Sequence, residues 1–97
     1  QPEIRKLSEN KWKVSGLNDI EDLLEEIPLP VEPNDAYDTL GGLVLYMLGS
    51  VPKDGTRFRL ELEGYSLLVI NVDHHRIQEV IIEKNEGHKE QDEAAEQ

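Results

Sequence analysis

One cluster in the sequence has side chains of the types that bind metal ions: Asp73, His74 and His75. A zinc site takes three or four such ligands. However, consecutive side chains of an extended chain point to opposite faces, which does not favour a shared ion. The remaining histidine, His88, lies in an acidic C-terminal stretch. The three residues are therefore metal candidates, and the competing interpretation, which we favour, is a solvated turn between two strands.

A second candidate site is the start of an apolar segment, where Thr39, Gly41 and Gly42 lie. Backbone N–H groups at a helix N-terminus can bind phosphate, and glycine lets a ligand approach closely. There is no G-x-G-x-x-G motif and no P-loop lysine, and Asp35 and Asp38 stand where the anion would sit. Two interpretations remain, a cofactor-binding helix start and tight packing against another element. The acidic flanks favour packing.

Catalytic chemistry finds no support in the sequence. The chain has no cysteine, so disulfides, thiolate metal sites and cysteine nucleophiles are excluded. No serine has the G-x-S-x-G setting of a nucleophile elbow, and no carboxylate pair is assembled by spacing. We therefore predict a protein that is not an enzyme, with no catalytic residues.

The charge balance excludes further classes. The 97 residues carry 21 acidic against 10 basic side chains, a net charge of -11. Nucleic-acid binding rests on a basic surface, so no nucleic-acid partner is expected. No apolar run approaches the roughly 18 residues that span a bilayer, so no membrane insertion by this chain is expected either.

The hydrophobic periodicity predicts an α+β domain. An entry strand or a hairpin comes first, with a turn at Glu9-Asn10, and a helix capped by Asn18 or Asp19 follows. Three strands are then predicted: the first by alternation, the second as a run that is apolar on both faces, and the third with a bulge near Gln78-Glu79. Together these elements predict a small, mostly antiparallel sheet of about four to five strands with two principal helices packed on it. The domain should span residues 1–84, and residues 85–97 should form an acidic, mobile or weakly helical tail.

The second helix is the most apolar element. Asp38 or Thr39 should cap it, and Gly49 should end it. Its apolar residues extend nearly all round, which predicts that other elements cover most of its surface.

Three segments resemble the transporter-associated domain of the CorC/HlyC family: Gly16–Leu23, Asp38–Val44 and Gly49–Gly55. The run Arg76–Val80 is similar too, and the resemblance covers roughly residues 11–83. The helix that begins Thr-Leu-Gly-Gly, followed by a glycine and P-x-x-G, is the most specific part.

The resemblance implies a cytoplasmic module of a hemolysin-like membrane protein that exports magnesium and cobalt. It implies a non-catalytic regulatory role and, as partners, a transmembrane domain and a pair of nucleotide-sensing domains of the same protein. The fold would be related to a flavin-binding superfamily, so FAD is the one cofactor that kinship suggests, although none is expected. A flavin- or adenine-nucleotide-binding domain and a divalent-cation sensor are the alternatives, and a homodimer is a candidate assembly. The family supplies no catalytic or ligand residues to carry over.

Overall fold

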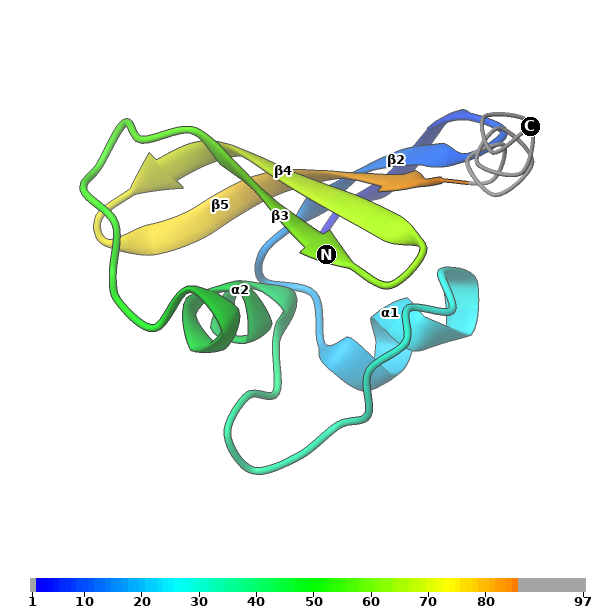
Figure 1. The fold of residues 1–97 in the computed structure, drawn as a ribbon, viewed down its shortest axis with the longest axis horizontal. Helices are drawn as coiled ribbons and strands as arrows, with labels where there is room; N and C mark the ends of the chain where they lie inside the picture. Colours follow the sequence, from blue (N-terminus) through cyan, green and yellow to red (C-terminus); the bar gives the residue numbers. More distant parts are fainter. Residues whose placement is uncertain (1, 86–97) are drawn as a thin grey trace, which may run out of the picture.

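The computed structural model describes residues 2–85. Along the chain, the strands and helices are β1 (Ile4–Ser8), β2 (Lys11–Ser15), α1 (Ile20–Glu26), α2 (Leu40–Leu48), β3 (Phe58–Leu62), β4 (Tyr65–Asp73) and β5 (Arg76–Lys84) (Figure 1). The predicted α+β class is confirmed. The strand hairpin around Glu9-Asn10 and the three later strands are confirmed as well.

All five strands form one antiparallel sheet in the order β1-β2-β5-β4-β3. The two longest strands, β4 and β5, lie inside it, while β1 and β3 form its edges. Both helices lie on one face of the sheet, and the chain between them loops beneath (Figure 1). The fold is therefore a two-layer arrangement with one face of the sheet left uncovered by helices.

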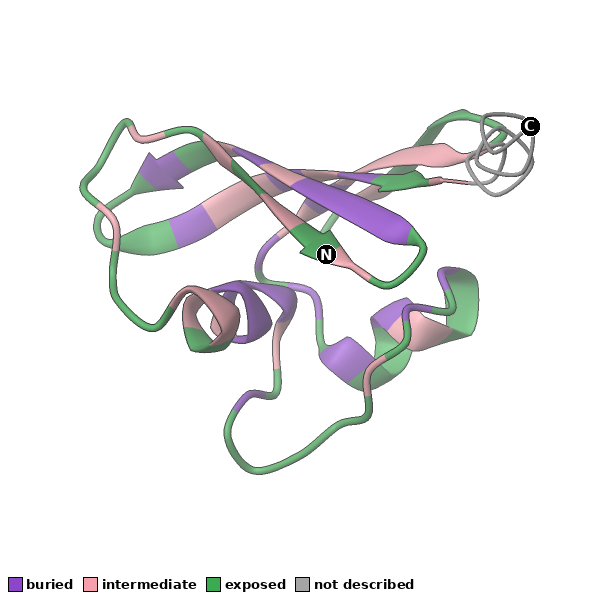
Figure 2. Ribbon diagram, viewed as in Figure 1, coloured by how far each residue is buried: buried purple, intermediate pink, exposed green. Residues whose placement is uncertain are grey.

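The hydrophobic core fills the space between the sheet and the helices, where the buried residues gather (Figure 2). It draws one buried stripe from each helix and the inward residues of β2, β4 and β5. The fully buried members include Val14, Leu23, Leu40, Leu67 and Val80. Burying a side chain of this size contributes about 1.5–3 kcal/mol to the free energy of unfolding. These core residues therefore provide the main stabilisation of the fold.

The inward alternation changes phase in the middle of the β4–β5 pair. Val69 pairs with Val80, Asn71 with Glu79 and Val72 with Ile77, so one residue on each strand, Ile70 and Gln78, has no direct partner. The bulge predicted near Gln78-Glu79 is confirmed, and the one on β4 was not predicted. The two extra residues restore the inward direction of Val72 and Ile77, both of which are buried.

Each helix begins at a predicted capping residue. Asp19 precedes α1, and its carboxylate accepts the N–H of Glu21. Thr39 precedes α2, and Gly49 follows α2 in the left-handed conformation with a φ of 82°. Side-chain caps and a left-handed glycine satisfy backbone groups that a helix end leaves unpaired.

The expectation that other elements cover most of the surface of α2 is confirmed, with Tyr46 as the one exposed residue of the helix. Leu43 and Val44 are buried, but Leu45, Met47 and Leu48 are half-buried, and Tyr46 is 61% exposed. Leu45 and Met47, from the later turns, still pack against the hydrophobic core. Within residues 2–85, neither helix is long and apolar enough to cross a membrane.

Candidate functional site

The start of α2 is tied into the fold by its own N–H groups. Leu40 donates to the carbonyl of Asn18 and Gly41 to the carbonyl of Gly16, each at 2.9 Å, and Gly42 donates to the Thr39 hydroxyl at 3.0 Å. A phosphate at a helix N-terminus binds to free N–H groups. The first three N–H groups of this helix already donate to acceptors within the fold. The first turn therefore lacks the free donors that an anion needs.

The glycines of this region allow backbones to touch. A Cβ on Gly41 would lie 3.2 Å from the Gly16 carbonyl oxygen and 3.4 Å from the Cβ of Ile77. A Cβ on Gly42 would lie 3.3 Å from the Thr39 hydroxyl. On Gly16 itself, a Cβ would overlap the carbonyl oxygen of Ile77. The loop before α1 is thus wedged between α2 and β5, as the tight-packing interpretation requires.

A groove opens beside this contact and brings the three sequence candidates Thr39, Gly41 and Gly42 together. Its volume is about 310 Å³, and its lining also includes Gly16, Leu17, Leu45, Arg76 and Ile77. The glycines contribute no side chains to it, while Leu17, Leu45 and Ile77 are its large aliphatic members. Leu17 is 57% exposed, so the groove is apolar and open to solvent. We call it the α2 groove. The cofactor-binding role of its three candidates stays a prediction.

The two helix starts are joined by a short antiparallel bridge. Asp19 faces Thr39, the N–H of Ile20 donates to the carbonyl of Asp38, and the N–H of Leu40 donates to the carbonyl of Asn18, each at 2.9 Å. The buried Asn18 also donates its side-chain N–H groups to the carbonyls of Glu3 and Ser15. Sequence reasoning named Asn18 only as a capping candidate and missed this bracing role.

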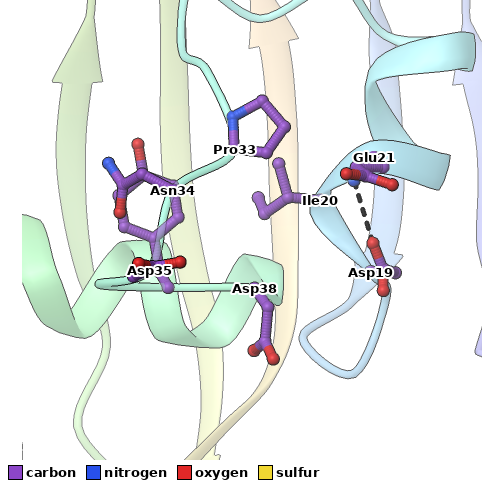
Figure 3. A pocket seen from close by; sticks show the side chains of 8 residues that line it. Asp19, Ile20, Glu21, Pro33, Asn34, Asp35 and Asp38 are labelled. Carbon is purple, nitrogen blue, oxygen red and sulfur yellow. Dashed lines mark hydrogen bonds between the residues drawn. The ribbon is translucent and has the colours of Figure 1, made fainter.

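A second hollow, also of about 310 Å³, lies next to this bridge and is acidic (Figure 3). The carboxylates that line it belong to Asp19, Glu21, Asp35 and Asp38. Carboxylates beside helix N-termini are stabilised by the helix dipole, which gives Asp19 and Glu21 a structural reason to be acidic. The sequence contains these acids in two separate runs, and only the bridge brings the runs together.

The metal candidates lie at the turn between β4 and β5. His74 and His75 have φ angles of 55° and 63°, the left-handed conformation of a tight hairpin turn. His74 Nδ1 lies 3.0 Å from Asp73 Oδ2, and the N–H of His75 donates to Asp54 Oδ1 at 2.8 Å. No group of three or more His, Cys, Asp or Glu side chains within residues 2–85 is placed to hold a metal ion.

Asp54 joins this turn to the loop before β3. The hydrogen bond from the backbone N–H of His75 favours the ionised carboxylate and lowers the pKa of Asp54 below its ordinary value. The N–H of Gly55 donates to the carbonyl of Val72 beside it. The Asp-His-His sequence therefore builds a docked turn, and the prediction that it holds no metal ion stays a prediction.

Several curated bacterial proteins resemble the chain. The UPF0053 protein YegH of Escherichia coli is 32% identical over 80 residues, which are 82% of this chain and 15% of YegH. A polyamine export protein of Salmonella typhimurium is 31% identical over 76% of this chain and 16% of its own length. The magnesium and cobalt efflux protein CorC of E. coli is 33% identical over 80% of this chain and 26% of its own length. The chain thus spans a minor part of each relative.

Solved structures share the fold. A hemolysin domain from Enterococcus faecalis superposes with a TM-score of 0.75 at 20% identity, covering 84% of this chain and 95% of that one. A transporter-associated domain from Nitrosomonas europaea gives 0.70 at 22%, covering 84% and 94%. An antiparallel sheet with two helices on one face defines the chain as a small two-layer α+β domain. The chain belongs to the CorC_HlyC family of transporter-associated domains, whose model matches residues 5–86.

The predicted family resemblance is confirmed by this match. The family is a transporter-associated domain, and no cofactor-binding family is indicated. The predicted domain boundary at residue 84 stays a prediction. The predicted tail lies outside the described residues except for Asn85, whose N–H donates to the carbonyl of Gly64.

Proposed function

We propose that this chain is a non-catalytic regulatory and interaction module of a hemolysin-like cation transport protein, working on the cytoplasmic side of the membrane. The α2 groove is the observation that carries the proposal, because it offers an apolar docking surface on a rigid base. The cargoes that the names of two relatives state, polyamines in one and magnesium and cobalt in the other, are all cations. Divalent-cation efflux is the specific form that we propose.

The lining of the α2 groove is mostly apolar, with Arg76 as its one charged member, and this suits a protein contact. Gly16, Gly41 and the Ile77 carbonyl form a closely packed base, and the helix N–H groups are engaged within the fold. The large aliphatic residues Leu17 and Leu45 stand beside this base. Exposed apolar surface of this kind, with polar surroundings, is typical of docking sites.

The proposed occupant is another domain of the same protein. The relatives are several times longer than the matched segment, which covers 15% of YegH and 26% of CorC. A transmembrane domain and a pair of nucleotide-sensing domains are the partners that the family resemblance implies. Docking at the α2 groove would let this domain bias the conformation of the transporter, since a contact that differs between two states shifts their populations.

The test is made in the full-length protein that carries this domain. Leu17→Asp places a charge in the α2 groove at an exposed position, so the free energy of unfolding of the domain should change little. We expect cation flux in vesicles, followed with magnesium, cobalt and a polyamine in turn, to change at least about threefold for the true cargo, as a loss of about 0.7 kcal/mol of docking would produce.

Leu7→Asp is the matched control, since Leu7 is an exposed leucine on the edge strand β1 and is absent from the α2 groove lining. Equal flux in both variants and the wild type would refute a regulatory contact at the groove.

The side of the membrane is tested separately by protease digestion of sealed vesicles of known orientation. Cleavage of the domain only in inside-out vesicles is the expected result.

A further inference from the structure

The free edge of β3 has a self-complementary charge pattern. Residues 57–63 read Arg-Phe-Arg-Leu-Glu-Leu-Glu, with arginines before the central Leu60 and glutamates after it. Within the described chain, β3 pairs only with β4, so its other side has no strand beside it. An edge of this kind presents N–H and C=O groups that can pair with another strand.

We propose that two copies of this chain associate through β3, antiparallel and centred on Leu60, which joins their sheets into one. In this register, Arg59 of each copy lies opposite Glu61 of the other. The outer Arg57 and Glu63 meet in the same way. Residues directly opposite in an antiparallel pair lie on the same face, where opposite charges attract and like charges repel. The pairing therefore creates four arginine–glutamate contacts and no like-charge contact.

Neighbouring registers are disfavoured by the same residues. A shift of two residues in one direction places Arg59 opposite Arg59 of the other chain. A shift of two residues in the other direction places Glu61 opposite Glu61 of the other chain. A shift of one residue would bring the half-buried Phe58, Leu60 and Leu62 opposite charged residues. Only the register centred on Leu60 satisfies both the charges and the apolar face.

The apolar side of β3 is also incomplete in a single copy. Phe58, Leu60 and Leu62 pack against the core but are only half-buried. In the proposed pair, Phe58 lies opposite Leu62 of the other copy and Leu60 lies opposite itself. The association therefore removes further apolar surface from water, which favours it.

The net charge of -11 per chain opposes self-association, but the local balance differs. The segment 57–63 contains two arginines and two glutamates and is locally neutral. Repulsion between more distant carboxylates is screened, since the Debye length is about 8 Å at physiological salt. The other edge strand, β1, carries Arg5 and Lys6 at its centre and acids only at its flanks, Glu3 and Glu9, so a pairing centred on Lys6 places Lys6 opposite Lys6 and Glu3 opposite Glu9. The charges therefore favour β3 for a pairing about the centre of an edge strand.

Sedimentation over a wide concentration range tests the association, because a single strand pairing predicts a weak dimer. Arg59→Glu and Glu61→Arg each turn two attractive contacts into repulsive ones, so each should raise the dimer dissociation constant at least about tenfold. The double variant restores opposite charges and should recover dimerisation. A mixture of the two single variants should form a heterodimer. Arg5→Glu on β1 makes the same charge change and should have no such effect.

Cysteine cross-linking tests the register directly, because the natural chain has no cysteine. In Leu60→Cys the two thiols would face each other, within the Cα separation that a disulfide requires. In the matched control Leu62→Cys they would lie about 13 Å apart along the strands. Selective oxidation of Leu60→Cys to a covalent dimer is expected. Equal cross-linking of both variants, or a wild type that stays monomeric at every concentration, would overturn the proposal.

Discussion

The carbonyl oxygen of Ile77 occupies the space in which a side chain on Gly16 would begin. The same glycine accepts the N–H of Gly41 through its carbonyl and donates its own N–H to the carbonyl of Gln78. One residue without a side chain thus joins α2, β5 and the loop before α1. The α2 groove rests on this contact.

Gly16→Ala should be strongly destabilising for that reason. A methyl group at this position must displace backbone, and overpacking of this kind costs about 1–3 kcal/mol. Urea unfolding measures the loss. Gly42→Ala is the matched control, because its added methyl meets the Thr39 hydroxyl and the Tyr37 side chain at 3.3 Å. There the gain in helix propensity, about 1 kcal/mol, offsets the tighter contact. Equal stability of the two variants would contradict the packing argument.

Thr39→Ala should lower the free energy of unfolding by about 1 kcal/mol, the usual effect of removing a helix N-cap. The Thr39 hydroxyl accepts the Gly42 N–H at 3.0 Å, and alanine has no acceptor to offer there. Thr39→Ser keeps the oxygen and should retain most of the stability. Chemical denaturation of the three proteins side by side is the measurement. A serine variant as unstable as the alanine variant would show that the methyl group, not the cap, matters.

The Asp54 carboxylate should titrate below its ordinary pKa of 3.8. Its pKa is lowered in the folded state, so the stabilisation is present above the unfolded pKa and is lost as the pH falls through the folded value. The amide signal of His75 should report this titration by NMR, because that N–H donates to the carboxylate. Asp54→Asn should abolish the shift. A midpoint at or above 3.8 would show that the bond is absent in solution.

The acidic hollow should make stability depend on salt. Asp19, Glu21, Asp35 and Asp38 line it together, and added sodium chloride screens their mutual repulsion. Melting temperatures should therefore rise with salt, and Asp35→Asn should reduce that dependence. Magnesium chloride at equal ionic strength separates screening from binding. A larger rise with magnesium would reveal specific cation binding, because a ligand that binds only the folded state stabilises it increasingly as its concentration exceeds the dissociation constant.

Much of the fold could be predicted from the residues alone. Alternation and glycine or proline punctuation located the strands, because side chains of a half-buried strand alternate between core and solvent. The slip in parity after Ile77 predicted the bulge in β5. The bulge at Ile70 was missed, since a strand apolar on both faces shows no change of phase when a residue is inserted. The exposure of Tyr46 was missed too, because an apolar pattern does not say which neighbour covers it.

Local chemistry along the chain thus determined the elements of this domain, their caps and the family to which it belongs. Turn, cap and periodicity signals depend on residues a few positions apart. Only the tertiary structure decided which residues, distant in the sequence, lie side by side. The bridge between Asp19 and Thr39 gathers the carboxylates into one hollow, and the contact of Gly16 with Ile77 makes the floor of the α2 groove. The tertiary structure also places β3 at an edge of the sheet, where its charged residues can pair with those of a second copy. These relationships join residues far apart in sequence, and packing rather than local propensity sets them.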